Sequence, residues 1–220
     1  MNIPLLKLDY SKKSEPQFLE FWSKFYIDAK AENFYTDTID NPQFSDEDIR
    51  SLFEWKNGMK FNEHVQKEAS LKNVISKLDV VNQLKLNFDM NVFNSNFSEM
   101  SPIWKVFLLH VIQPSRYPIF DQHVYRAHVF ITNREIKEIR ESRTFKEDYY
   151  FNIYLPYYNT LIPHASDSRM IDKALWSFGK FLKTLYASKL IIEGEEEEGA
   201  KPDEWVTDGL VIDGRLTSLL

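Results

Sequence analysis

The chain has 220 residues, of which 43% are hydrophobic, 15% aromatic and 27% charged, a composition typical of a globular protein rather than a disordered one. It contains no cysteine, which excludes a disulfide scaffold, a cysteine nucleophile and a thiolate metal site. Only six residues are glycine, and no glycine-rich phosphate-binding motif is present. The low glycine content and the missing motif argue against a nucleotide-binding fold of the Walker or Rossmann type.

The sequence also bears on where the protein resides. No apolar run approaches the ~18 residues that cross a bilayer, so we expect no membrane association. The first residues, Met1 to Lys7, lack a basic segment followed by a long apolar one, so we expect no secretory signal. Together with the absence of cysteine, these features lead us to expect a cytoplasmic protein.

The sequence predicts mainly helices, joined by loops, between residue 14 and residue 189. A first helix begins near Ser14, with Pro16 in its first turn. A second begins at Ser45, which is followed by three acidic residues, and ends at Gly58. Residues 87–96 are rich in asparagine and are predicted to form a loop. A period near 3.6 in the apolar residues predicts further helices over 63–85, 101–113, 121–131, 145–162 and 167–189.

Two of these helices have a distinctive composition. The helix over 145–162 carries five tyrosines, which either pack in the core or stack on an extruded base. The helix over 167–189 combines a wide apolar surface with a basic outer face that includes Arg169 and Lys173. Gly179 within it indicates close packing against another helix, because glycine there costs ~1 kcal/mol relative to alanine.

The charge is distributed unevenly along the chain, whose net charge is −6. Residues 102–190 hold 13 basic and 8 acidic residues, whereas residues 191–220 hold two basic and nine acidic ones. Affinity for nucleic acid depends on local charge. The basic segment is therefore compatible with DNA binding, and Arg116, Arg169 and Lys173 are its candidate contacts to DNA.

The acidic C-terminal residues differ from the rest of the chain. The run Glu195–Glu198 predicts an exposed connector, because neighbouring glutamates repel one another. Two Asp-Gly turns within residues 203–217 predict a small β element. We therefore divide the chain into a helical domain, 1–190, and an acidic tail, 191–220, with a β-hairpin. The tail is a candidate contact to a protein partner.

One segment carries more specific information. Residues 101–113 and 121–131 predict two helices joined by a short turn between Pro114 and Pro118. Residues 118–126 read Pro-Ile-Phe-Asp-Gln-His-Val-Tyr-Arg. This segment resembles the helix-hairpin-helix DNA glycosylases, the superfamily of endonuclease III and the 8-oxoguanine glycosylases, in which an aspartate opens a helix and is followed by His, Val and Arg. The resemblance covers residues 60–190 and implies an all-α fold.

The resemblance implies a site. Asp121 would be the carboxylate that stabilises positive charge on the sugar as the N-glycosidic bond breaks. Lys105, sixteen residues upstream, would be the amine nucleophile that displaces the base. His123 and Arg126 would orient Asp121 or tie its helix to a neighbour. The implied function is that of a DNA-binding hydrolase in DNA repair or defence, with no metal and no cofactor.

The sequence leaves a second interpretation open. The stretch from Phe97 to Lys105 contains no glycine, whereas the family's hairpin uses glycine N–H groups to bind a DNA phosphate. On this interpretation the chain is a catalytically inactive helical module that contacts proteins. Asp121 is then only a helix N-cap, Lys105 a surface lysine, Arg126 part of a buried ion pair and His110 a core residue.

Overall fold

The computed structural model describes residues 14–26, 29–58 and 65–184, and these are mostly helical, with no strand among them. The prediction of an all-α fold is confirmed for this part of the chain. The predicted boundary at residue 190, the acidic tail and the β element over 203–217 lie outside the described residues. Among the helices in the described ranges, none has the length and apolar character needed to cross a bilayer.

The described residues fall into two compact units. The first unit is built from residues 14–26, 122–138 and 161–184, and the second from residues 29–58, 65–121 and 139–160. Each unit therefore combines segments that are far apart in the sequence.

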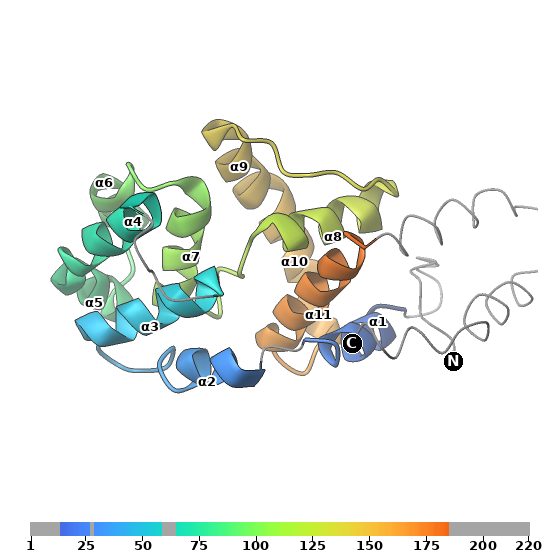
Figure 1. Cartoon of the computed structure of the whole chain (residues 1–220), viewed down its shortest axis with the longest axis horizontal. Coiled ribbons are helices and arrows are strands. Elements are labelled where there is room, and N and C mark those ends of the chain that lie inside the picture. The colour runs from blue at the N-terminus through green and yellow to red at the C-terminus, as the bar shows by residue number, and fades with distance from the viewer. Residues whose placement is uncertain (1–13, 27–28, 59–64, 185–220) are drawn as a thin grey trace, which may run out of the picture. The chain divides into compact units, whose positions relative to one another are not determined.

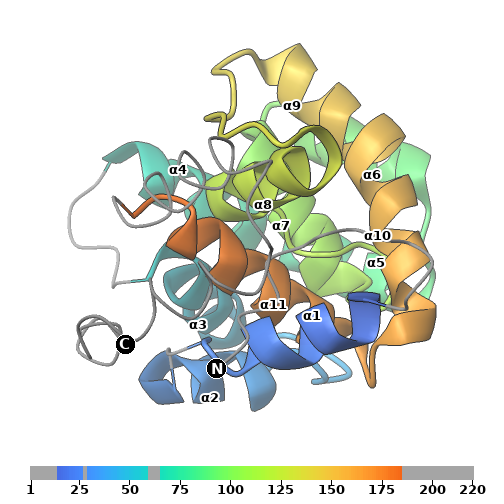
Figure 2. The ribbon, with the colours of Figure 1, turned by 90° about the vertical axis from the view of Figure 1, so that its right-hand side faces the viewer.

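The first unit packs α11 (Ser168–Phe181) between α1 (Ser14–Ser23) and α8 (Gln122–Asn133), as Figures 1 and 2 show. The short 3-10 helix η3 (Ile162–His164) precedes α11. The rings of Phe18 and Trp22 on α1 lie 5.2 Å and 5.0 Å from the ring of Phe178 on α11. The apolar face of α11 is thus buried against α1, as its sequence pattern predicts.

Gly179 of α11 lies directly against the backbone of α8. A Cβ built at this position would overlap the backbone carbonyl of His123. The close packing predicted for this glycine is confirmed, and the reason is that only a residue without a side chain leaves room for the α8 backbone.

The second unit contains the remaining helices. Within it α3 lies between α2 and α4 (Figures 1 and 2). Its elements are α2 (Ala29–Thr36), α3 (Asp46–Asn57), α4 (Val65–Ile75), α5 (Leu78–Leu86), α6 (Met90–Phe97), α7 (Pro102–Ile112), α9 (Arg143–Tyr149), the π-helical turn η2 (Tyr150–Tyr154) and α10 (Leu155–Leu161).

The ends of α3 follow the sequence signals. Ser45 and Asp48 form a capping box, in which the Ser45 side chain accepts from the Asp48 backbone and the Asp48 side chain accepts from the Ser45 backbone. Gly58 ends the helix in the left-handed conformation, with φ at 75°. The predicted start and stop of this helix are both confirmed, and they place Lys56 in its last turn.

Four predicted elements differ from the structure. The helix predicted over 167–189 ends at Phe181, and residues 182–184 form a turn. The helix predicted over 63–85 is two helices, α4 and α5, separated at Ser76 and Lys77. The predicted loop over 87–96 is wrong, because Asp89 caps α6 by accepting from the backbone of Asn91 and Val92, and Phe93 and Phe97 are buried. The helix predicted over 145–162 is present but passes through the π-helical turn η2.

Candidate functional site

Asp121 is the residue directly before α8, the position predicted for it. It follows the turn that leaves α7, and backbone oxygens of this turn bind side chains of the second unit. The Tyr150 hydroxyl donates to the Pro118 oxygen at 3.0 Å, and a ring nitrogen of His110 lies 2.8 Å from the Tyr117 oxygen. The turn before Asp121 is therefore fixed in place by the helices beneath it.

The tyrosine-rich helix is part of the core. Phe120 packs against the rings of Tyr149, Tyr150 and Tyr154, with ring centroids 6.1, 5.5 and 5.0 Å away. All three tyrosines are buried. Of the two interpretations of these tyrosines, core packing is the one the structure supports, and their role is to support the turn that carries Asp121.

The Asp121 carboxylate forms an ion pair with Lys56 of α3. The distance between Lys56 Nζ and Asp121 Oδ2 is 3.1 Å, and the two side chains are only 8% and 17% exposed. The Lys56 ammonium therefore holds the carboxylate at a fixed position. Sequence reasoning did not find Lys56, because its partner is 65 residues away and no local pattern marks it.

Lys105 lies in the first turn of α7 and is buried, with a side chain that is 10% exposed. It is therefore not a surface lysine. Its Nζ is 3.7 Å from Glu147 Oε1 on α9, and the same oxygen lies 3.8 Å from Arg143 Nη1. Both distances exceed those of direct hydrogen bonds, so Glu147 interacts with these cations through ion pairs without a hydrogen bond at Oε1.

The two predicted catalytic residues thus lie in the second unit, and each has an identified charged partner. Asp121 pairs with Lys56, and Lys105 pairs with Glu147. Removing either partner would leave a charge with little access to solvent. Both ion pairs therefore contribute to the stability of the folded protein, whether or not Asp121 and Lys105 are catalytic.

The predicted supporting residues His123 and Arg126 lie on α8 in the first unit. Arg126 is fully buried and donates to the Gly179 oxygen at 2.7 Å and to Glu138 Oε1 through Nε and Nη2. Its Nη1 lies 3.2 Å from His123 Nδ1. Arg126 therefore ties α8 to α11 and to the segment after α8, which is one of the two roles considered for it, and its burial leaves no route to a DNA phosphate.

The three predicted DNA contacts lie in different units. Arg116 is exposed on the second unit, with its guanidinium 5.5 Å from the centre of the Phe88 ring. Arg169 and Lys173 lie on α11 in the first unit. Both lie over the ring of Tyr26, at 5.1 and 5.5 Å from its centre. The structure therefore brings Arg169 and Lys173 together, which their spacing of four residues on one helix predicts.

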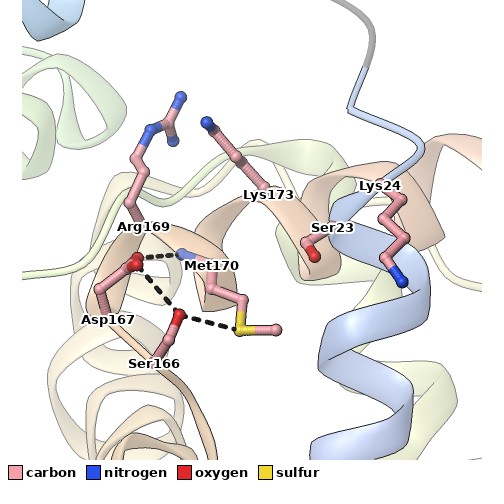
Figure 3. A pocket seen from close by; sticks show the side chains of 7 residues that line it. All are labelled: Ser23, Lys24, Ser166, Asp167, Arg169, Met170 and Lys173. Atoms are coloured by element: carbon pink, nitrogen blue, oxygen red, sulfur yellow. Dashed lines mark hydrogen bonds between the residues drawn. The ribbon is translucent and has the colours of Figure 1, made fainter.

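Arg169 and Lys173 line a pocket of about 440 Å³ in the first unit. Figure 3 shows the cationic groups of Arg169 and Lys173 pointing to the same side, with Lys24 across from them, directly after the end of α1. Asp167 also lines this pocket, but its Oδ1 accepts from the Met170 backbone at 2.7 Å and caps α11. The full lining consists of Ser23, Lys24, Ser166, Asp167, Arg169, Met170 and Lys173. Three cationic side chains therefore surround this pocket.

Two buried histidines belong to the core. The Nε2 atom of His110 is 2.7 Å from the Tyr35 hydroxyl, so this histidine has a partner at each ring nitrogen, as predicted for a core residue. Burial lowers the pKa of His128 to about 4, which leaves it neutral near pH 7. In the part of the chain that the structure describes, no group of three or more potential ligand side chains is arranged to hold a metal ion.

Comparisons with family models, with curated proteins and with solved structures give no match for this chain.

Proposed function

We propose that the chain is a DNA-binding protein of the helix-hairpin-helix glycosylase type and that it cleaves an N-glycosidic bond with Asp121 as the electrostatic catalyst. The observation that carries this proposal is the position of the Asp121 carboxylate. It follows a turn held by buried side chains, it lies 3.1 Å from the Lys56 ammonium, and 17% of its side chain remains exposed. A carboxylate fixed in this way needs no reorganisation before it stabilises a developing cation.

The reaction places specific demands on Asp121. The bond between C1′ and the base nitrogen breaks with both electrons leaving on the base, and the sugar gains oxocarbenium character. The negative charge of Asp121 stabilises this cation. Water then attacks C1′, its proton passes to a base or to solvent, and the released base is protonated. Asp121→Asn keeps the size of the side chain and removes the charge.

Lys105 is the candidate nucleophile for the second version of this chemistry. Its amine would replace water at C1′ and then form a Schiff base with the opened sugar. An ammonium must lose a proton before it attacks, and the Glu147 carboxylate, 3.7 Å away, is the group placed to receive that proton. In this version Glu147 acts on Lys105 and Asp121 acts on the sugar.

A second candidate function is a catalytically inactive helical module that binds proteins. The observation that favours it is that Asp121 and Lys105 each take part in an ion pair with another residue. On this alternative, Asp121 and Lys105 only stabilise the second unit through their ion pairs, and no base is released.

A base-release assay distinguishes the two functions. The full chain is incubated with DNA duplexes that each contain one deaminated, oxidised or alkylated base, and abasic sites are revealed by alkaline cleavage. We expect wild type to act on at least one duplex and Asp121→Asn to lose at least about 100-fold in rate, the scale of a lost electrostatic catalyst. Asp148→Asn, a change at an exposed carboxylate on α9, is the matched control and should act like wild type.

Trapping with borohydride tests Lys105 separately. A Schiff base is reduced to a stable covalent adduct between protein and DNA, and Lys105→Ala should form none. Glu147→Gln should slow adduct formation if Glu147 accepts the proton. A folded wild-type protein that releases no base from any duplex supports the inactive module.

A further inference from the structure

The outer face of α11 carries a regular row of cationic and aromatic side chains. Arg169, Lys173, Trp176 and Lys180 are spaced by four, three and four residues, so they lie on one face of the helix. All four are at least partly exposed. We call these four residues, together with Tyr26, the α11 stripe.

The rings of the α11 stripe are in contact with one another and with its cations. The Tyr26 ring lies 5.2 Å from the Trp176 ring, in an edge-to-face arrangement. Arg169 and Lys173 lie over the Tyr26 ring, and Lys180 Nζ lies 4.6 Å from the centre of the Trp176 ring. His123 supports Trp176 from α8, with ring centroids 5.4 Å apart. The stripe is therefore held in place by contacts among α8, α11 and Tyr26, which follows α1.

We propose that the α11 stripe binds single-stranded DNA, with phosphates on its cations and bases on Tyr26 and Trp176. We rest this proposal on the DNA-binding function proposed above and extend it to the form of DNA that is bound. Surfaces that bind single strands combine a positive groove along the backbone with aromatic rings on which bases stack. The α11 stripe has both components in one unit of the protein.

The charge of the stripe favours a polyanion. Its three cations are joined by Lys24, which together with Arg169 and Lys173 lines the pocket of about 440 Å³ at the start of α11 (Figure 3). Lys24 forms an ion pair with Glu20, so the density of positive charge is greatest on α11 itself. A pocket between these cations has the chemistry to accept a phosphate group, and the stripe continues from it along the helix.

The length of the stripe matches a short strand. Arg169 and Lys180 are eleven positions apart, about 17 Å along a helix that rises 1.5 Å per residue. A stacked strand rises about 3.4 Å per nucleotide, so the stripe spans about five nucleotides. A duplex keeps its bases stacked on each other and would leave Tyr26 and Trp176 without a role, which is why we assign a single strand.

Contacts to aromatic rings also prepare the cations for binding. Arg169, Lys173 and Lys180 each lie over a ring, which restricts where their charged groups can move. Less side-chain freedom is then lost when a phosphate binds. A set of cations on an isolated helix without such rings would not have this advantage.

The proposal is tested by fluorescence anisotropy with a labelled 12-nucleotide oligothymidine and the full chain. The stripe variant replaces three cations by glutamine, namely Arg169→Gln, Lys173→Gln and Lys180→Gln. The control variant removes the same charge elsewhere, through Arg50→Gln, Lys72→Gln and Lys137→Gln. We expect the stripe variant to bind at least tenfold more weakly, with a salt dependence reduced by about two units because each neutralised phosphate contributes about 0.7. The control variant should stay within about twofold of wild type.

The aromatic part of the proposal has its own test. Trp176→Leu should weaken binding by about fivefold or more, the scale of a lost stacked base, whereas Trp176→Phe should retain most of the affinity. A duplex of the same length should bind more weakly than the single strand. Equal losses in the stripe and control variants, equal affinity for Trp176→Phe and Trp176→Leu, or a duplex that binds as tightly as the single strand would overturn the assignment.

Asp121→Asn separates this proposal from the proposed catalysis. It removes the catalytic carboxylate and leaves the α11 stripe unchanged, so it should bind the oligonucleotide like wild type. If wild type releases a base but does not bind the single strand, the stripe proposal fails and the catalytic one stands. If the single strand binds through the stripe and no base is released, the catalytic proposal fails and the stripe proposal stands.

Discussion

Lys56 and Asp121 are 65 residues apart in the sequence, yet Lys56 Nζ lies 3.1 Å from Asp121 Oδ2. Lys56 lies in the last turn of α3, one residue before the last helical position, Asn57. Asp121 ends the turn that follows α7. The ion pair therefore fixes the carboxylate of the candidate site to a helix that contains no part of the sequence motif.

The first prediction concerns this pair. Lys56→Met should lower the free energy of unfolding by about 2–3 kcal/mol, because it leaves the Asp121 carboxylate largely buried without its cation. The double variant Lys56→Met with Asp121→Leu should be less destabilised than the sum of the two single changes. Urea unfolding of the four proteins measures the coupling, and additive effects would show that the pair contributes no interaction energy.

The second prediction separates the structural role of Arg126 from DNA binding. Arg126→Lys keeps the charge but cannot reach both Glu138 and the Gly179 oxygen in the same way, so we expect a loss of about 2–4 kcal/mol in stability. Because Arg126 is fully buried, the salt dependence of oligonucleotide binding should not change. A reduced salt dependence in a folded Arg126→Lys protein would instead indicate a phosphate contact.

The third prediction compares two glycines. Gly179→Ala places a methyl group against the His123 carbonyl, and because this neighbour is backbone, α8 must shift, at a cost of about 3 kcal/mol. Gly58→Ala meets no atom within 4 Å and pays only for its left-handed conformation, about 1 kcal/mol. Thermal unfolding of both variants should rank Gly179→Ala as clearly the less stable. The reverse order would contradict the close packing of α8 and α11.

The fourth prediction concerns pH. The pKa of His128 is lowered by burial to about 4 in the folded protein, against about 6.5 when unfolded, so between these values the unfolded state binds more protons. His128 should therefore not lower the free energy of unfolding above pH 6.5. As the pH drops from 6.5 through 4, protonation of His128 in the unfolded state should lower this free energy by as much as about 3 kcal/mol. The curve for His128→Gln, measured by urea unfolding at each pH, should lack this component. Parallel curves for the two proteins would mean that His128 does not titrate in this way.

Local sequence signals predicted the helices whose ends are set by neighbouring residues. The capping box at Ser45 and the stop at Gly58 bound α3 because each involves backbone groups within four positions. The same kind of signal was present at Asp89, which caps α6, but the high asparagine content of residues 87–96 outweighed it in the prediction. Burial of Phe93 and Phe97 then stabilises a helix that composition alone disfavours.

For two core residues, Gly179 and His110, the sequence predicted the kind of contact but not the partner. Gly179 within a helical pattern predicted a close contact, but that the contact is the His123 backbone is a property of the fold. His110 on an apolar helix predicted a satisfied core histidine, and the structure identifies Tyr35 and Tyr117 as the groups it contacts. In both cases the residue type predicts the kind of contact, and the packing of the helices determines which atom makes it.

The sequence by itself determined the all-α class, both ends of α3, the start of α11 and the position of Asp121 directly before α8, because short-range hydrogen bonds and a 3.6-residue period decide such features. Only the tertiary structure paired Asp121 with Lys56 and Lys105 with Glu147, and only it placed Tyr26 beneath Arg169 and Lys173. These partners lie between 42 and 147 residues apart in the chain. Charge–charge and cation–aromatic contacts depend on distance in space, and distance in space between remote segments is set by how the apolar helix faces pack together.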